Sequence, residues 1–386
     1  LLFRSYLCLS APAMTAAERL AAIEAHLERC RAVRDEDFSG MTEPERAAEA
    51  ERRRQEALEE ARLTEIRARE QTSAEAAQKM MHRARWHRGR ARILDFDPKQ
   101  EGGVYYNRLY FVDHATFDLD EESPIGPMRY TNRVSKPGQQ PFTPCAGLNI
   151  FSVRISTSDV GFPIQVYGTV IARDSIDKKC IYLFRRDRDD CQLINSEHDS
   201  LMLTGPKRGI VLIDDSYVET NLKIKGHGGQ DRELSKGILA IRGIARRYLD
   251  ACQVERESLA TRLSTVDVMY SAVKDAVEAT ITIEVVQGDF YGEITAHTTS
   301  IQNRLSLYNS EVGGCMSVDA NGAIQLMRAV ISVYVKEKLV IVAKTRDSKD
   351  ERTIDFTPKL NGDGEGDITV GATKMHVKVT WSIMDF

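Results

Sequence analysis

The densest group of chemically active side chains is the run His-Arg-Ala-Arg-Trp-His-Arg-Gly-Arg-Ala-Arg at residues 82–92. Guanidinium groups pair with phosphate oxygens and an indole ring can stack on a base, so this run could contact RNA or a ribosome. The candidate nucleic-acid residues are Arg83, Arg85, Trp86, Arg88 and Arg90. The alternative is a solvated basic helix end that favours the C-terminal helix dipole, or one that pairs with Asp95, Asp97 and the acidic stretch 118–122. The whole-chain charge favours this alternative, because 57 acidic against 53 basic residues leave a net charge of -4.

Metal chemistry needs His, Cys or carboxylate side chains at short spacing, and the histidines and cysteines of this sequence are scattered. The stretch Asn-Gly-Asp-Gly-Glu-Gly-Asp at residues 361–367 begins like a calcium-binding loop. However, Ala372 stands where such a loop places its bidentate acid. We therefore expect an acidic hairpin turn at this stretch, and neither a metal nor another cofactor.

The sequence has no pattern typical of phosphate binding or covalent catalysis. The glycine-rich stretch 225–231 is not followed by a Walker lysine, and the charged stretch 185–190 alternates in sign after its first pair. Neither a G-x-S-x-G nor an H-E-x-x-H motif occurs, so no nucleophile or general base can be nominated. A hydrolase or N-glycosidase is a minor hypothesis, and its carboxylates would have to come from separate loops, at Asp214, Asp215, Glu284 or Asp289.

Cysteine usage and hydropathy indicate the cellular setting. Seven cysteines are odd in number, widely spaced and without a C-x-x-C pair, which favours free thiols in a cytoplasmic or nuclear protein. No apolar run reaches the roughly 18 residues that cross a bilayer, so we expect no membrane partner. The first methionine is Met14, and the region before it lacks the charged start of a secretory signal.

The N-terminal third is rich in Ala, Glu and Arg, which are strong helix formers. We expect an extension with a short helix at 1–41, and one charged α-helix at 42–93 that starts with a Thr-x-x-Glu capping box and ends in the basic run. A single solvated helix is favoured over a coiled coil, because the large apolar residues are few and irregular: Leu58, Leu63 and Ile66. Residues 94–146, with several prolines and glycines, predict a linker or a docked arm.

From residue 147 the pattern changes to period two, which places alternate side chains on opposite faces of a strand. The cleanest examples are residues 277–285 and 375–383, where apolar side chains alternate with polar ones. One polar face per strand is typical of antiparallel sheets. The fold class is therefore mainly β: an antiparallel β-sandwich at 147–386, preceded by the charged helical segment. The alternative is two subdomains divided near Asp250.

Several long strings within residues 149–383 occur in an order that resembles the domain of unknown function 6598 of plants, which is abundant in grasses. They include Ser-Asp-Val-Gly-Phe-Pro at 158–163, Leu-Phe-Arg-Arg-Asp at 183–187 and Val-Thr-Trp-Ser at 379–382. The motif positions, of unassigned role, are Asp159, Gly161, Pro163, Tyr167, Gly168, Asp174, Phe184, Arg185, Arg186, Asp187, Asp289 and Trp381.

That family also resembles the C-terminal part of a cereal jasmonate-induced protein, whose N-terminal part is similar to ribosome-inactivating N-glycosidases. The toxin-like part has no counterpart here, because the helical segment lacks its Tyr, Tyr, Glu-x-x-Arg, Trp set. The resemblance implies a plant, stress-associated and non-catalytic module. We therefore expect a binding module with a protein partner, and the alternative is an RNA- or ribosome-associated protein that uses the basic run.

Overall fold

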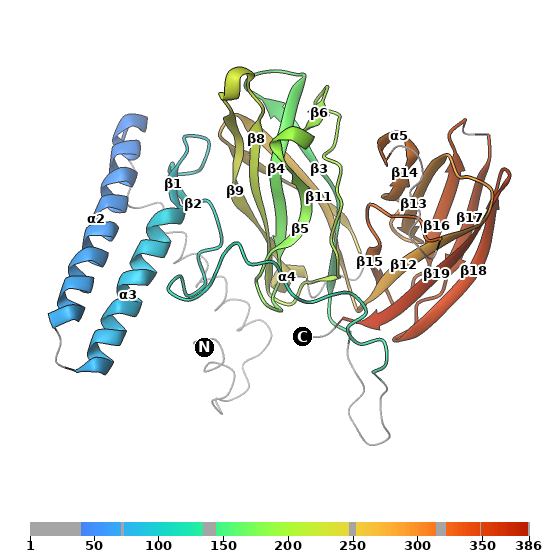
Figure 1. The fold of residues 1–386 in the computed structure, drawn as a ribbon, viewed down its shortest axis with the longest axis horizontal. Coiled ribbons are helices and arrows are strands. Elements are labelled where there is room, and N and C mark those ends of the chain that lie inside the picture. The colour runs from blue at the N-terminus through green and yellow to red at the C-terminus, as the bar shows by residue number, and fades with distance from the viewer. Residues whose placement is uncertain are drawn as a thin grey trace.

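The computed structural model describes residues 40–70, 73–133, 144–246, 252–313, 322–347 and 349–384. The short helix expected within residues 1–41 lies outside this part of the chain, as do Cys8, Cys30 and Cys315. The described chain is mainly β, with antiparallel sheets that follow a helical segment, so the predicted fold class is confirmed. Three units lie in a row: a pair of helices and two β-sandwiches (Figure 1). In the described chain no helix is long and apolar enough to span a bilayer.

The helical segment consists of two packed helices, α2 (Glu43–Glu70) and α3 (Ala74–Ile93), rather than the single helix expected at 42–93. The predicted start is confirmed, because the carboxylate of Glu45 accepts hydrogen bonds from the backbone N–H and the hydroxyl of Thr42, each at 2.7 Å. Ser73 caps the second helix by accepting a bond from the N–H of Ala76. The chain thus reverses between the two helices.

Small residues form the seam between the two helices. On α2, Ala61, Thr64 and Ala68 are buried and spaced by three and four residues, which places them on one helix face. On α3, Ala84 and Ala91 are buried. The larger apolar residues that the sequence analysis weighed point elsewhere and are exposed: Leu58, Leu63 and Ile66. The expectation of a solvated single helix is corrected, because an alanine seam can bury a helix without large side chains.

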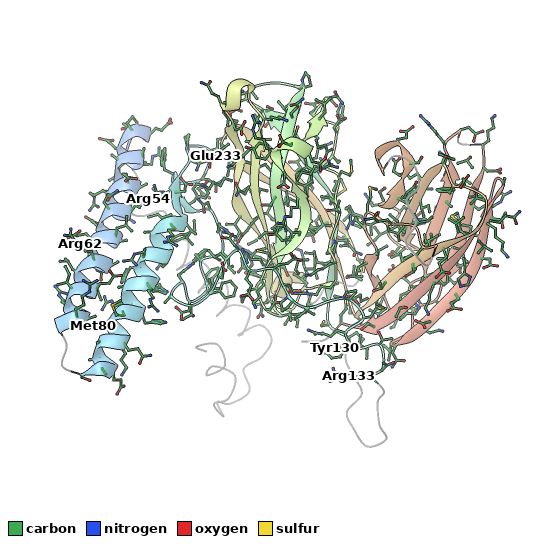
Figure 2. The ribbon with its side chains drawn as sticks, viewed as in Figure 1. Arg54, Arg62, Met80, Tyr130, Arg133 and Glu233 are labelled. Carbon is green, nitrogen blue, oxygen red and sulfur yellow. The ribbon has the colours of Figure 1, made fainter. Side chains whose placement is uncertain are left out.

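The described part of 94–146 is a docked arm. It begins with a short antiparallel hairpin of β1 (Leu94–Phe96) and β2 (Val104–Tyr106). The Tyr105 hydroxyl donates to the carbonyl of Lys236 at 2.7 Å on the first sandwich. The backbone N–H of Tyr130 donates to Ser382 Oγ at 2.8 Å on the second sandwich, where Figure 2 shows Tyr130. The arm therefore contacts both sandwiches.

The first sandwich packs two antiparallel sheets face to face around one apolar core. One sheet has the strand order β10 (Val254–Thr261), β11 (Ser264–Val273), β3 (Gly147–Ser158) and β7 (Ile210–Val211). The other has β5 (Ile181–Arg186), β4 (Ile164–Arg173), β8 (Asp215–Ile224) and β9 (Arg232–Arg242), with β6 (Gln192–Ile194) paired to β4. Short helical turns lie at η2 (Arg188–Asp190), η3 (His227–Gly229) and α4 (Gly243–Arg246).

The second sandwich has the same plan with its own core. One sheet has the order β15 (Val330–Tyr334), β12 (Ala276–Gln287), β19 (Thr373–Ile383) and β18 (Gly362–Val370). The other has β14 (Leu305–Asn309), β13 (Gly292–Thr298), β16 (Leu339–Thr345) and β17 (Glu351–Phe356), and α5 (Ser310–Gly313) follows β14. The acidic stretch 361–367 forms most of β18, and the reversal lies after it, at Gly371. The expected hairpin turn is thus displaced, because the carboxylates find lysine and threonine partners across the strand pair.

The region 147–386 contains two apolar cores where the sequence analysis expected one domain. The boundary lies between Val273, which ends β11, and Ala276, which begins β12. The alternative division near Asp250 has the right number of units but falls before the strands β10 and β11, which complete the first sandwich. A small junction cluster of Val211, Val273, Ala276 and Met384 joins the two units.

Candidate binding groove

A polar groove lies on the outer face of the β10-β11-β3 sheet in the first sandwich. Successive side chains of a strand point to opposite faces of the sheet. Val153, Val266 and Val268 point into the core, so their neighbours along the strands point outward. The groove has a volume of about 150 Å³, and its lining is Ser152, Arg154, His198, Ser200, Arg256, Asp267 and Met269. We call these seven residues the polar groove.

Two segments outside this sheet border the polar groove. The loop after β6 runs beside β3, where Ser200 pairs with Arg154 in an antiparallel bridge and the N–H of Leu201 donates to the carbonyl of Val153 at 2.8 Å. From the second sandwich, the Asn303 amide donates to the sulfur of Met269 at 3.4 Å. The groove therefore lies where the two sandwiches face each other.

The charges of the polar groove are unequally satisfied. The carboxylate of Asp267 accepts hydrogen bonds from Ser156 Oγ at 3.0 Å, Ser258 Oγ at 2.7 Å and Arg154 Nη2 at 3.4 Å. In contrast, the side chain of Arg256 is exposed, and its guanidinium makes no hydrogen bond or ion pair with any residue of the described chain. One guanidinium of the groove is thus available to a ligand.

The groove holds the residue types of a hydrolytic triad but not its geometry. A serine nucleophile needs a histidine within hydrogen-bond reach, oriented by a carboxylate. The His198 ring makes no hydrogen bond to Ser152, Ser200 or Asp267, and its charged neighbour is Glu197 at 3.8 Å. Asp267 is already engaged by two hydroxyls and Arg154. The arrangement therefore fits binding better than catalysis.

The basic run lies on α3, and four of its five candidate residues have partners within the helical unit and its hairpin. Arg83 pairs with Glu60 at 3.1 Å, and Arg88 pairs with Glu65, both acids on α2. The Arg90 guanidinium lies over the rings of Trp86, at 4.7 Å, and Tyr106, at 4.9 Å.

Arg85 differs from the other four candidates. It is exposed and has no ion pair among the described residues. The structure thus places the basic run mainly against α2, where its arginines pair with Glu60 and Glu65 rather than with the expected Asp95, Asp97 or stretch 118–122, and does not bring it to the polar groove.

Five family-motif positions serve turns and packing. The Phe184 and Trp381 side chains are fully buried, one in each core. Gly168 has φ +115°, and a Cβ there would lie 2.1 Å from the carbonyl oxygen of Asn221. Gly161 has φ +72° in the turn after β3, and Pro163 follows a cis peptide bond. These five residues account for local backbone conformation and core packing, and none of them supplies a reactive group.

The remaining motif positions engage in polar contacts that are also local. Asp174 pairs with Arg208 at 2.5 Å, and both side chains are buried. The other contacts are Asp159 with Lys99, Tyr167 with Asp231, Arg185 over the Tyr182 ring, Arg186 with Asp190, and the Asp289 carbonyl with Thr373, whereas Asp187 precedes η2 without a side-chain cap hydrogen bond. None of the twelve motif positions lines the polar groove.

The carboxylates of the minor hydrolase hypothesis lie in different units. Asp214 and Asp215 precede or begin β8 in the first sandwich, and burial raises the pKa of Asp215. Glu284 and Asp289 are exposed near the end of β12 in the second sandwich. Across the described ranges, no group of three His, Cys, Asp or Glu side chains could hold a metal ion.

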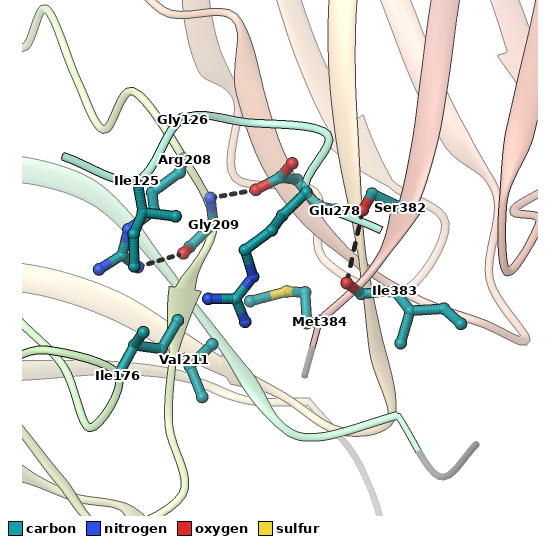
Figure 3. A pocket seen from close by; sticks show the side chains of 11 residues that line it. Ile125, Gly126, Ile176, Arg208, Gly209, Val211, Glu278, Ser382, Ile383 and Met384 are labelled. Atoms are coloured by element: carbon teal, nitrogen blue, oxygen red, sulfur yellow. Dashed lines mark hydrogen bonds between the residues drawn. The ribbon is translucent and has the colours of Figure 1, made fainter. Parts of the chain in front are cut away.

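A small crevice of about 20 Å³, room for about one water molecule, lies at the junction of the arm and the two sandwiches (Figure 3). There the buried carboxylate of Glu278 accepts hydrogen bonds from the backbone N–H groups of Gly209 and Met128, each at 2.5 Å. Burial raises the pKa of Glu278 despite these bonds. This crevice joins the units and is too small for an organic ligand.

The sequence analysis did not identify the polar groove. The only available signal was that Ser152, Arg154, Arg256 and Asp267 occupy outward positions of alternating strands. The strand pairing that makes them neighbours joins β3 and β10 through β11, across about a hundred residues of chain. No local pattern specifies that pairing.

Known proteins place the chain in a family but do not assign it an activity. No curated protein matches the sequence. Two solved structures of human GIVD cytosolic phospholipase A2, one in complex with methyl gamma-linolenyl fluorophosphonate, are 8% and 9% identical, with TM-scores of 0.22 and 0.18. Each match covers 63% of this chain and 33% of the phospholipase, so the chain spans about a third of those proteins. Scores this low do not indicate a common fold. The family model for the domain of unknown function 6598 matches residues 147–379, and the chain therefore belongs to this family.

Proposed function

We propose that this chain is a non-catalytic binding module, and that its polar groove receives a polar segment of a partner protein. The observation that carries the proposal is Arg256, a guanidinium that lines a hollow and has no partner in the described chain. Exposed arginine is enriched where protein surfaces recognise one another, because its planar fork donates several hydrogen bonds. The absence of a poised nucleophile in the groove also supports binding.

The size of the groove favours a side chain or a short segment over a whole metabolite. Pockets that enclose drug-sized ligands have volumes of about 300 to 1,000 Å³. The polar groove has about 150 Å³ and is lined by charged and hydroxyl side chains. A protruding segment of another protein fits such a shallow, polar hollow.

The proposed setting is a plant cell under stress, in the cytoplasm or nucleus. Its support is the resemblance of the motif strings to grass proteins. In the described chain, Cys180, Cys191 and Cys252 are free thiols, in keeping with a reducing compartment. The RNA- or ribosome-associated alternative has weaker support, because Arg83, Arg88 and Arg90 already have partners.

The test is affinity capture from grass seedling extract with the full chain and two variants. Arg256→Glu reverses the free charge of the polar groove, and Arg85→Glu makes the same charge change on α3. We expect one partner protein to be retained by the unaltered chain and by Arg85→Glu, and to fall at least tenfold with Arg256→Glu. Equal retention by all three would show that the groove is not the binding site. Retention that ribonuclease or Arg85→Glu abolishes would support the RNA alternative instead.

A further inference from the structure

We infer that the polar groove is an oxyanion-binding site, in which Arg256 and Arg154 hold a carboxylate or phosphate group. The inference rests on the proposed function, since it names the chemistry of the segment that the groove receives. It is argued from strand register, charge and free hydrogen-bond donors.

Strand register places Arg154 and Arg256 on the two strands that flank β11. On β10, Arg256 pairs with Met269 of β11, and on β3, Ser152 pairs with the same Met269. Arg154 lies opposite Asp267, two residues along. With strands about 4.8 Å apart and about 3.4 Å per residue, the two arginine Cα atoms are about 12 Å apart. Both side chains line one hollow, so an anion above Met269 lies between them.

The charge of the groove is positive. Two guanidiniums and one carboxylate, those of Arg154, Arg256 and Asp267, leave a formal charge of one positive unit among the lining residues. Because Asp267 already accepts three hydrogen bonds, it does not neutralise Arg256. The other titratable group of the lining is His198, which lies beside Glu197 at the rim.

Neutral donors complete the site. The hydroxyls of Ser152 and Ser200 have no hydrogen-bond partner in the described chain, and both line the hollow. A guanidinium can bind two oxygens of a carboxylate or phosphate in parallel, and a hydroxyl can donate to a remaining oxygen. A neutral ligand could offer Arg256 a carbonyl or hydroxyl oxygen but no charge to balance the guanidinium, and charge-assisted bonds are stronger, so the donor set favours an anion.

The experiment uses the full chain and measures binding by calorimetry at constant ionic strength. Three probes are titrated: inorganic phosphate, a hexaglutamate peptide and a neutral hexaglutamine peptide. A few charge-assisted hydrogen bonds in an open groove predict dissociation constants on the order of millimolar for phosphate and hexaglutamate. We expect Arg256→Gln to weaken the binding of both anions at least tenfold, Arg256→Lys to weaken it less, and Ser152→Ala to weaken it a few-fold. Hexaglutamine is expected not to bind.

Arg85→Gln is the matched control, because it removes one exposed guanidinium outside the groove and should leave anion binding unchanged. Each variant is checked for an unchanged unfolding midpoint. The inference is overturned if neither anion saturates the protein, or if Arg85→Gln and Arg256→Gln have the same effect. The two anions distinguish the source of the oxyanion: a stronger response to phosphate indicates a phosphorylated ligand, and a stronger response to hexaglutamate indicates an acidic segment.

Failure of the inference and failure of the proposed function give different results. If capture of a partner depends on Arg256 but neither anion competes for it, the groove binds a partner through other chemistry. If both anions bind through Arg256 but no captured protein depends on that residue, the oxyanion site stands without the proposed partner.

Discussion

Asp95 accepts a hydrogen bond from Nη2 of Arg262 at 2.5 Å, which joins the β1-β2 hairpin to the turn between β10 and β11. Arg262 also donates from Nη1 to the carbonyl of Phe96 at 3.0 Å and pairs with Glu233 at 2.9 Å. Figure 2 shows Glu233 on the side of the first sandwich that faces the helical unit. Burial alone would raise the pKa of Asp95, but hydrogen bonds from Arg262 and Asn107 outweigh it and lower the pKa. This pair holds the helical unit on the sandwich.

Replacing Arg262 should loosen the helical unit without unfolding the sandwiches. Arg262→Gln removes the charge that Asp95 and Glu233 share, and hydrogen bonds to charged groups contribute about 1.5 to 3 kcal/mol. We expect faster amide hydrogen exchange across residues 94–106, measured by mass spectrometry. Arg62→Gln is the control, because Arg62 is exposed on α2 and its only ion pair in the described chain is a loose one, with Glu59 at 3.6 Å. Unchanged exchange in Arg262→Gln would mean that other contacts suffice for docking.

The buried pair of Asp174 and Arg208 should dominate the stability of the first sandwich. Asp174 accepts from two nitrogens of Arg208, at 2.5 and 3.1 Å, and from the N–H of Val211 at 3.0 Å. Asp174→Ala removes the nearest carboxylate from a buried guanidinium and leaves it the longer contact with Asp177 at 3.4 Å, and breaking a buried pair costs about 3 to 5 kcal/mol. Denaturant unfolding measures this loss. The exposed pair of Asp355 and Lys338 is the comparison, and Asp355→Ala should cost much less, because solvent screens this pair. Similar decreases in the free energy of unfolding of the two variants would contradict the prediction that the buried pair contributes more to stability than the exposed pair.

Gly168 should tolerate no side chain, in contrast to Gly161. Both have positive φ, but a Cβ on Gly168 would lie 2.1 Å from the Asn221 carbonyl oxygen, whereas a Cβ on Gly161 meets open space. Gly168→Ala must separate β4 from β8, and we expect a loss of about 3 kcal/mol or more. Gly161→Ala should lose only the backbone strain, roughly 1 kcal/mol. The midpoints of thermal unfolding of the two variants test this prediction, and equal decreases in the two midpoints would contradict it.

Glu278 should make stability fall as pH rises. Its pKa is raised by burial above the ordinary value, so the folded protein favours the protonated form. A group with a raised folded pKa contributes stability that is present below its unfolded pKa, about 4.3, and is lost as pH rises through the folded value. The groups that face it are the N–H donors of Met128 and Gly209 and, through charge, Arg208 and Arg129.

The measurement is the unfolding midpoint of the full chain between pH 4 and pH 8. Glu278→Gln keeps one acceptor oxygen but cannot ionise, so its profile should lack the part of the decline that Glu278 contributes, while the part from Asp215, whose pKa burial also raises, remains. A decline of equal size in Glu278→Gln would assign the pH dependence to other groups. Asp355→Asn, at an exposed pair, serves as the control for removing one carboxylate.

Local sequence patterns were enough to predict individual helices and strands. Alternation along β12 and β19 predicted which side chains face the second core, and Val277, Ile281, Val377 and Trp381 are buried as that pattern requires. The Thr42 to Glu45 capping box predicted the start of α2. These features were predictable because side-chain direction follows from backbone periodicity over a few residues.

What covers each face of a helix or strand depends on contacts between elements that are distant in the chain. Glu278 and Thr280 belong to the polar face of β12 in the sequence pattern, yet both are buried in the folded chain. For Glu278 the reason is that Gly209 and the arm meet it at the junction. Likewise, Ala61, Thr64 and Ala68 on α2 are buried only because α3 packs against them.

The polar groove follows the same physical rule. Arg154 and Arg256 are neighbours only because β11 pairs with both β3 and β10. Periodicity specifies the direction in which a side chain points, whereas long-range strand pairing selects the residues beside it. That choice depends on the packing of the whole core rather than on any local pattern.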